Sequence, residues 1–254
     1  MKRRSAGKLG RKLGISEVGS QFKLSDYLVD PLPIYNGSDD FTSGLVDWGI
    51  AGNDQYGDCG VAGDYHYNMA NALTAGETPL TVPDSGTTVE QAIVAEYLSY
   101  DNGQDEGVDL GQWLTYRLTH TLAGLPVIGG FAQVSDSGAE YQSAFHLFGG
   151  LYTGIAVSQE MMDEFEEGQP WTSTSTDWIG GHCVPHLARN SKWGRAITWG
   201  ADQLFSWQNW QATRQEAYVI FTPEQIDAPG GVFHGVQVAA LKADIQKLHG
   251  TLAA

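Results

Sequence analysis

Residues 52–63 read GNDQYGDCGVAG, a loop rich in Gly, Asn and Asp that runs into an apolar pattern. Apolar residues then recur every four positions, at Val61, Tyr65, Met69 and Leu73, which predicts a helix that begins near Cys59. The free N–H groups and the dipole at a helix N-terminus favour a thiolate over a thiol. Because the thiolate is the attacking form, this position suits a nucleophile. A free cysteine is otherwise commonly a small buried hydrophobe, so that alternative stays open.

A second motif, Gly-Gly-His-Cys-Val-Pro-His, covers residues 180–186 and opens a predicted strand. His182 is a suitable base for a thiol, because its pKa lies near neutrality. Gly181 would let a substrate backbone approach closely. The alternative for His182 is an ordinary packed and hydrogen-bonded histidine.

A third motif, Ala-Ile-Thr-Trp-Gly, covers residues 196–200. A strand here would place one residue beside the His182 ring, where a side-chain oxygen such as that of Thr198 can hold the useful tautomer. The indole of Trp199 can shield that hydrogen bond from water. The alternative is a plain hydrophobic strand.

The order of the predicted elements favours an α+β fold. Helices are expected first, over 59–73, 89–100 and 110–122, with further helices over 139–148, 159–166 and 236–248 and a helix-like segment at 207–210. Short strands are expected over 126–134, 151–157, 182–189, 195–200 and 217–222. The Pro/Gly/Thr-rich stretch 74–88 indicates a loop. We expect one domain over 23–254, with a helical lobe at about 50–125 and a sheet lobe at about 126–254.

The three motifs together resemble those of the papain-like cysteine peptidase superfamily: a cysteine at a helix start, a later Gly-Gly-His strand, and a strand ending in Trp-Gly. This resemblance implies a papain-like two-lobe fold, with an N-terminal helical lobe and a C-terminal antiparallel sheet lobe. It implies a thiol-dependent hydrolase of a peptide or amide bond in a peptide or protein substrate, without a cofactor. Cys59 would be the nucleophile and His182 the base, with Gly181 and Trp199 contacting substrate.

The superfamily also has an amide side chain about six residues before its cysteine, which helps to form the oxyanion hole. Asn53 matches that position, and Gln55, four residues before Cys59, is the second choice. The third catalytic residue of the superfamily is usually an asparagine in an Asn-Ser-Trp-Gly run. Here Ile197 occupies that slot when Trp199-Gly200 is aligned, and Thr198 is the residue whose hydroxyl could orient His182. This departure leaves the competence of the site open.

The chain also resembles a group of proteins encoded by bacteriophages and bacteria that share Asp-Trp-Gly, Gly-Asn-Asp, Gly-Asp-Cys, Gly-Gly-His and Thr-Trp-Gly in this order. That resemblance runs from residue 23 to near the end and implies a viral or prophage source. It also supports an alternative function, in which a catalytically idle papain-like fold serves as a structural or binding protein of the virion.

Charged residues are distributed unevenly along the chain. The formal net charge is −16, yet the first 23 residues hold seven of the fourteen basic residues and only one acidic residue. Residues 1–22 are therefore expected to form a flexible basic leader that contacts nucleic acid, another virion subunit or the chain's own acidic body. The alternative is a mobile, solvated leader that has no partner. The acidic body would repel nucleic acid and anionic membranes.

Other site chemistries have weaker patterns. Cys59, His182, Cys183 and His186 are suitable zinc ligands, but neighbours on a strand point to opposite faces and no Cys-x-x-Cys pattern exists, so no metal site is expected. The segment Trp207-Gln208-Asn209-Trp210 could line a carbohydrate cleft, although core packing is the simpler interpretation. No secretory signal or apolar span of about 20 residues is visible, so we expect host cytoplasm or virion.

Overall fold

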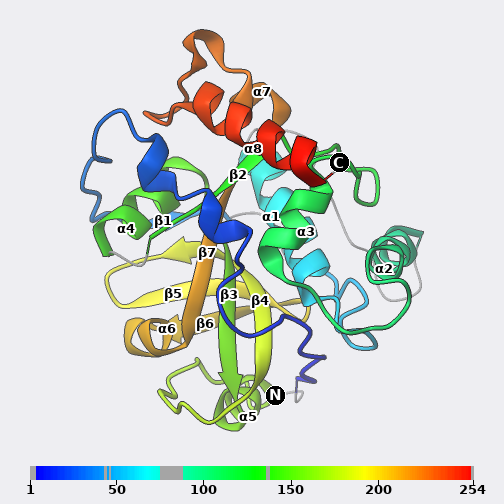
Figure 1. The fold of residues 1–254 in the computed structure, drawn as a ribbon. Helices are drawn as coiled ribbons and strands as arrows, with labels where there is room; N and C mark the ends of the chain where they lie inside the picture. Colours follow the sequence, from blue (N-terminus) through cyan, green and yellow to red (C-terminus); the bar gives the residue numbers. More distant parts are fainter. Residues whose placement is uncertain (1–3, 43–44, 46, 75–87, 136–137, 253–254) are drawn as a thin grey trace.

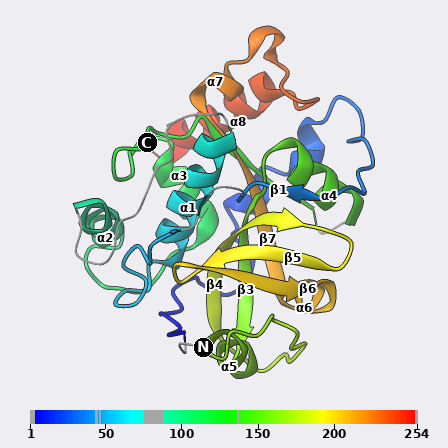
Figure 2. The same cartoon turned by 180° about the vertical axis from the view of Figure 1, so that it is seen from behind.

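The computed structural model describes residues 4–42, 45, 47–74, 88–135 and 138–252. Its centre is a seven-stranded antiparallel sheet in the order β2-β7-β3-β4-β5-β6, with β1 paired to β4. Helices α1 to α3 lie on one side of this sheet, as Figures 1 and 2 show from opposite directions. The combination of helices with an antiparallel sheet confirms the expected α+β class.

The central strands are the long ones. Strand β4 runs over Trp178–Arg189 and is buried from Gly181 onward, and β3 (Leu151–Ser158), on one side of it, is buried throughout. Strands β5 (Trp193–Thr198) and β6 (Ala201–Ser206) follow on the other side of β4. The remaining strands are β1 (Asp39–Asp40), β2 (Gly130–Gln133) and β7 (Arg214–Phe221).

Helix α1 (Cys59–Thr74) packs directly on β4. Gly63 permits this contact, because a Cβ there would lie 3.1 Å from Cys183 Sγ of β4, and Gly60 permits the approach of Val108, whose Cγ2 would lie 2.2 Å from a Cβ at Gly60. The other helices are α2 (Thr88–Tyr100), α3 (Leu110–Arg117), α4 (Gly138–Leu147), α5 (Gln159–Glu166), α6 (Trp207–Thr213), α7 (Pro223–Ile226) and α8 (Val238–Leu252), with single 3-10 turns at Gly19–Gln21, Leu24–Tyr27 and Pro229–Gly231.

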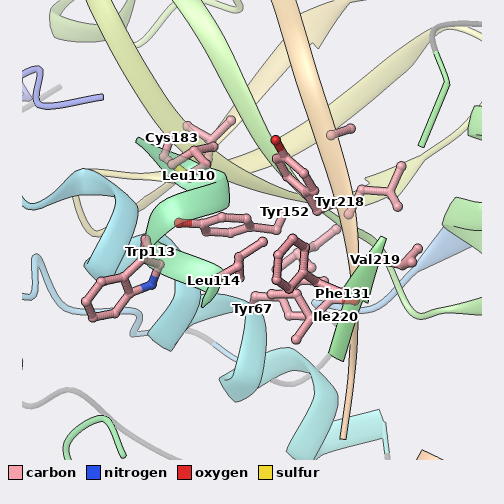
Figure 3. Close-up of a cluster of buried hydrophobic side chains, with 14 of the residues drawn as sticks. Tyr67, Leu110, Trp113, Leu114, Phe131, Tyr152, Cys183, Tyr218, Val219 and Ile220 are labelled. Atoms are coloured by element: carbon pink, nitrogen blue, oxygen red, sulfur yellow. The ribbon is translucent and has the colours of Figure 1, made fainter. Parts of the chain in front are cut away.

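The core lies between the helices and the sheet. Figure 3 shows Tyr67 of α1 near Tyr152, Phe131 and Tyr218 of the strands, with Trp113 of α3 at one side of this cluster. All five side chains are fully buried, and burial of side chains this large contributes on the order of 2–3 kcal/mol each. This packing fixes α1, and therefore Cys59 at its first turn, against the strand that contains His182.

Several elements differ from the sequence-based expectation. Strand β5 ends at Thr198 because Trp199 and Gly200 have φ of 46° and 72°, which makes a two-residue turn into β6. We expected neither that turn nor β6. Helix α3 is shorter than 110–122 and ends at Arg117. The loop expected over 74–88 lies outside the described residues except for its two ends.

The N-terminal residues that we expected to form a flexible leader lie against the body from Arg4 onward. Arg11, Ser16 and Phe22 are each at most 3% exposed, because their side chains pack or hydrogen-bond with the rest of the chain. Residues 4–42 thus add to the folded unit instead of standing apart from it. Within the described residues, no helix combines the length and apolarity that a membrane crossing requires.

Candidate active site

Cys59 occupies the first turn of α1, as the loop-to-helix pattern predicted. The helix starts there because the Asp58 carbonyl accepts hydrogen bonds from the N–H groups of Val61 (2.8 Å) and Ala62 (2.9 Å). The Cys59 side chain is only 1% exposed. A thiol at this point faces the positive end of the helix dipole.

His182 lies in β4, and two residues from the β5–β6 turn hold its ring. Its Nε2 shares a 2.7 Å hydrogen bond with Thr198 Oγ1. The Trp199 indole stacks on the imidazole at 4.6 Å with an interplanar angle of 25°. Trp199 adopts a left-handed conformation that non-glycine residues rarely take, and such conformations cluster at functional sites. The strained turn therefore places both the hydroxyl and the indole on His182.

The other ring nitrogen of His182 has no partner. Nδ1 is buried and makes no hydrogen bond within the described part of the chain. Leaving a buried polar atom unsatisfied costs on the order of 1–3 kcal/mol, and such atoms need an explanation. His182 and Cys59 both line one small cavity of about 10 Å³, whose lining also includes Asn53, Thr198 and Trp199.

Four of the sequence-based site residues thus share the cavity with Cys59: His182, Asn53, Thr198 and Trp199. The expected substrate contact Gly181 is the residue before His182 in β4, and a Cβ there would lie 2.3 Å from the Arg11 carbonyl oxygen. Gln55, in contrast, is exposed and does not line the cavity. The structure therefore does not bring Gln55 to the site, because the loop turns it outward at Gly52–Tyr56.

Asn53 is 2% exposed and already has one hydrogen bond inside its own loop. Its Nδ2 donates to the Tyr56 carbonyl at 3.0 Å. A primary amide carries two N–H groups, and the Asn53 side chain also hydrogen-bonds to the Asp58 carboxyl, which opposes the rise in the pKa of that carboxyl. The next residues of the loop are held by Asp105, whose carboxylate accepts from the Gly57 N–H at 2.7 Å.

Burial holds the pair uncharged in this closed arrangement. Burial raises the pKa of the Cys59 thiol to about 11, although the backbone amides of Cys183 and Gly10 oppose the shift. Burial, followed by the positive charge of Arg11, lowers the pKa of His182 to about 3. Burial also raises the pKa of the Asp58 carboxyl well above its usual value. At neutral pH the site therefore holds a thiol and a neutral imidazole.

Residues 4–16, here called the strap, cover the site. The Lys8 N–H donates to the Asn53 carbonyl at 2.7 Å, and a Cβ at Gly7 would lie 2.4 Å from the Trp199 ring. Farther along, the Arg11 N–H donates to the Gly181 carbonyl at 3.1 Å. Figure 1 shows this dark blue segment passing between the helices and the sheet. A substrate cannot reach Cys59 while the strap occupies this position.

Docking of the basic leader on the acidic body was one of the sequence-based alternatives, but its place over the candidate site was not predicted. A Cβ at Gly10 would lie 1.8 Å from the Gly57 carbonyl oxygen, so only glycine fits there. His66 was also missed; it lines the cavity, but its Nε2 is satisfied by the Trp48 and Gly49 carbonyls at 3.0 and 3.1 Å.

Among the described residues there is no group of three or more His, Cys, Asp or Glu side chains that could hold a metal ion. Cys183, one of the candidate zinc ligands, lies in the apolar core beside Leu110 (Figure 3). Trp210, from the candidate carbohydrate segment, is 1% exposed and stacks on Phe205 at 4.0 Å. That aromatic cluster is part of the core.

Comparison with known proteins finds similarity in structure only. No protein-family model matches the chain, and no curated protein matches its sequence. Solved structures that resemble it include xylellain, a cysteine protease from Xylella fastidiosa, with a TM-score of 0.62, 11% identity, and coverage of 87% of this chain and 98% of that one.

Two further similar structures are procathepsins. The digestive procathepsin L 3 of Tenebrio molitor has a TM-score of 0.55 and 13% identity, with 87% of this chain and 76% of that chain covered. The procathepsin B S9 of Trypanosoma congolense has a TM-score of 0.51 and 11% identity, with 85% and 86% covered. At these identities the comparison shows the fold: the chain has a papain-like α+β fold.

Proposed function

We propose that this chain is a thiol-dependent hydrolase of peptide or amide bonds, with Cys59 as nucleophile and His182 as base, and that the strap keeps it closed. The observation that carries the proposal is that His182 lines the same cavity as Cys59 and has a buried Nδ1 without a hydrogen-bond partner among the described residues. A ring fixed through Nε2 on Thr198, with Nδ1 left over, is the arrangement that a general base requires.

The reaction would begin when the strap leaves. With Nε2–H donating to Thr198 Oγ1, Nδ1 takes the thiol proton and the Cys59 thiolate adds to a substrate carbonyl carbon. The Cys59 backbone N–H and the Asn53 amide would donate to the oxyanion that forms. His182 then returns the proton to the leaving amine as the C–N bond breaks, which leaves a thioester. Water, deprotonated by His182, hydrolyses the thioester and regenerates the thiol.

Opening would also change the charge state of the pair. The pKa of Cys59 is raised and that of His182 lowered mainly by burial, and both shifts shrink when water enters. Once solvated, the imidazolium would stabilise the thiolate and the helix dipole would add to that effect. We expect the closed protein to be unreactive and the open one to be reactive at neutral pH.

The proposal is tested by alkylation of the intact chain with iodoacetamide at pH 6.5, with the modified residue located by mass spectrometry. Because the strap closes the site in the native chain, the comparison uses an Arg11→Ala background, which removes the buried ion pair that anchors the strap. We expect rapid modification of Cys59, no site labelling in Cys59→Ala, and retained labelling in the matched control Cys183→Ala. Equal labelling of the Cys59→Ala and Cys183→Ala proteins would contradict the proposal.

A second candidate function is favoured by one observation, the closed and uncharged state of the pair. A catalytically idle papain-like fold that serves as a binding or structural component, for example of a virion, would need no strap release. The expected contact of the basic N-terminus with nucleic acid or a virion subunit stays a prediction. Three of its basic residues, Arg4, Lys8 and Arg11, have partners within the chain, namely Gln203, Asp105 and Glu216.

A further inference from the structure

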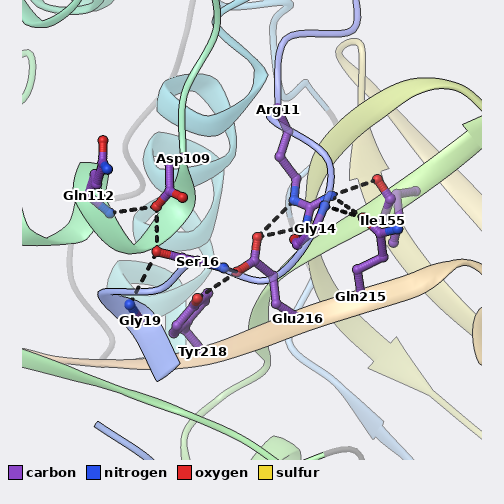
Figure 4. Close-up of polar contacts among 10 residues, drawn as sticks. All are labelled: Arg11, Gly14, Ser16, Gly19, Asp109, Gln112, Ile155, Gln215, Glu216 and Tyr218. Carbon is purple, nitrogen blue, oxygen red and sulfur yellow. Dashed lines mark hydrogen bonds and ion pairs between the residues drawn. The ribbon is translucent and has the colours of Figure 1, made fainter. Parts of the chain in front are cut away.

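The Arg11 side chain fills a buried pocket beside the candidate active site. Its Nε donates to Glu216 Oε1 at 2.9 Å, and its Nη2 lies 2.7 Å from the same oxygen. Its Nη1 donates to Gln215 Oε1 at 2.7 Å and to the Ile155 carbonyl at 3.4 Å. Figure 4 shows the guanidinium between β3 and β7, where these partners converge. Both members of the Arg11–Glu216 pair are at most 1% exposed.

The body of the protein shapes this pocket. A Cβ at Gly154 would lie 2.2 Å from Arg11 Nε, so the glycine provides the space that the guanidinium occupies. The Tyr218 hydroxyl donates to Glu216 Oε2 at 2.6 Å and fixes the carboxylate from the far side. Two of the groups that receive the guanidinium, Glu216 and Gln215, are neighbours in β7, and a third is the Ile155 carbonyl of β3. These three acceptors belong to the sheet and stay in place when the strap leaves, whereas a fourth acceptor, the Gly14 carbonyl, belongs to the strap and leaves with it.

An empty pocket would be unstable. Release of the strap removes the Arg11 charge and also the Ser16 N–H that donates to Glu216 Oε2 at 3.1 Å. A buried carboxylate without a counter-ion is strongly disfavoured, and breaking a buried pair by removing one partner is among the most destabilising of single changes. The open pocket would thus favour a ligand that brings back a cation.

The pocket lies next to the candidate catalytic residues. The Arg11 N–H donates to the carbonyl of Gly181, the residue directly before His182. The neighbouring Gly10 amide is close enough to Cys59 to oppose the rise in its pKa. A peptide that places an arginine in this pocket and pairs its backbone with Gly181 would therefore have an adjacent peptide bond near Cys59.

We propose that this pocket is an arginine-selecting substrate subsite and that Arg11 is its built-in occupant, which substrate must displace. The inference rests on the proposed function, and it names the substrate class: peptides or proteins with an arginine next to the bond that is cleaved. Arginine is preferred over lysine because the acceptors Glu216, Gln215 and the Ile155 carbonyl match a planar fork of donors. A lysine ammonium is a compact point charge that cannot donate to all three of these acceptors at once.

The test measures binding without any need for hydrolysis. The intact chain carrying Arg11→Ala is melted with increasing concentrations of N-acetyl-arginine amide, N-acetyl-lysine amide or N-acetyl-leucine amide. We expect a saturable rise in Tm with the arginine compound, binding about tenfold weaker with the lysine compound, and no response to the leucine compound. Wild type should respond to none of them at low concentration, because its pocket is filled. Equal responses to the arginine and leucine compounds would overturn the proposal.

Two variants separate the pocket from general effects of the added compounds. Glu216→Gln in the Arg11→Ala background should abolish the arginine response, since the carboxylate supplies the charge. Arg195→Ala is the matched control, because it removes an arginine that is about one third exposed and pairs with Asp40 at 3.2 Å. That variant should show no arginine-dependent rise, and a rise equal to that of Arg11→Ala would contradict the proposal.

If Arg11→Ala does not fold, Arg11→Lys replaces it, because lysine retains the charge next to Glu216. The arginine compound should then displace the substituted lysine side chain and raise the rate of Cys59 alkylation about tenfold, whereas the leucine compound should not. No difference between the two compounds would refute the arginine pocket. The two measurements distinguish a failure of the arginine-pocket proposal from a failure of the hydrolase proposal. If the protein binds arginine but cleaves no peptide, the pocket proposal stands and the hydrolase proposal is wrong.

Discussion

Two histidines of β4, His182 and His186, are four residues apart and both are at most 1% exposed. In His186 both ring nitrogens are satisfied. Nε2–H donates to the Ala188 carbonyl at 3.1 Å, so Nδ1 must accept from the Tyr141 hydroxyl at 2.7 Å. In His182 only Nε2 has a partner within the described residues. The same residue type in the same strand thus occurs once with a complete hydrogen-bond set and once without.

The surroundings of the two imidazole rings also differ. His186 is enclosed by aromatic rings, with Phe145 at 4.4 Å and Trp210 at 5.0 Å. His182 lines a cavity whose lining also includes Cys59 and Asn53. A buried histidine therefore identifies a site only when one nitrogen is fixed and the other is left over. His186 is a structural histidine, and the zinc-ligand alternative for it loses its support because both nitrogens are engaged.

The largest effect should come from His182→Ala compared with His186→Leu. In the Arg11→Ala background at pH 6.5, loss of the imidazole should reduce peptide hydrolysis by about 10³-fold, a typical contribution of a general base. Cys59 alkylation should fall as well. His186→Leu should keep both properties in the molecules that fold, but lower the unfolding free energy by about 2–4 kcal/mol. If Cys59 alkylation were lost in His186→Leu but not in His182→Ala, His186 would be the base and His182 the structural histidine.

Acidification should lower the stability of the fold through its buried histidines. The pKa of His182 and of His186 is lowered to about 3, and that of His66 to about 4, chiefly by burial. The unfolded chain binds these protons near pH 6.5, so the unfolding free energy should fall as pH drops from about 6.5 toward about 4. The expected slope is about 1.4 kcal/mol per pH unit for each histidine. Asp58, whose pKa is raised, opposes this trend. Urea unfolding at pH 7, 6 and 5 measures it, and constant stability would contradict these shifts.

A smaller effect is expected from Thr198→Val, which keeps the shape but removes the hydroxyl that holds His182 Nε2. Hydrolysis should fall by about 10²-fold, in line with the cost of losing the orienting group of a catalytic histidine. Thr198→Ser should restore most of the rate. The informative readout is the pH dependence of Cys59 alkylation, which should shift in Thr198→Val and return in Thr198→Ser. An unchanged profile in Thr198→Val would assign the residue to packing alone.

The smallest effect is expected from Tyr141→Phe. Its hydroxyl donates to His186 Nδ1 and accepts from Trp210 Nε1–H at 3.1 Å, so removal leaves two buried groups unsatisfied. The unfolding free energy should fall by about 1–3 kcal/mol. The alkylation rate of Cys59 should not change. A measurable loss of that rate would mean that the two histidine regions are coupled, contrary to the comparison.

Sequence patterns could predict the α+β class and the meeting of Cys59, His182, Asn53 and Thr198, because short motifs report local geometry and element order. Thr198 could be chosen over Ile197 since only its hydroxyl can accept from a ring nitrogen. Gln55 was a poor candidate because a four-residue offset says nothing about which way a loop side chain turns. The strap could be predicted only in part: its charge allowed docking on the acidic body, but its contacts with Glu216 and Gly181 join residues far apart in the chain, which no local pattern reports.

The central claim is that Cys59 and His182 form a reactive pair that the strap holds closed. The most direct test is the rate of Cys59 alkylation against pH in the intact wild-type chain and in Arg11→Ala, with hydrogen exchange of the Gly10–Lys12 amides as the measure of opening. We expect slow modification of the wild type, with a midpoint above the free-thiol value of about 8.5, and fast modification of opened Arg11→Ala with a midpoint well below it. A midpoint at or above about 8.5 in the opened variant would show that Cys59 and His182 do not form a reactive pair.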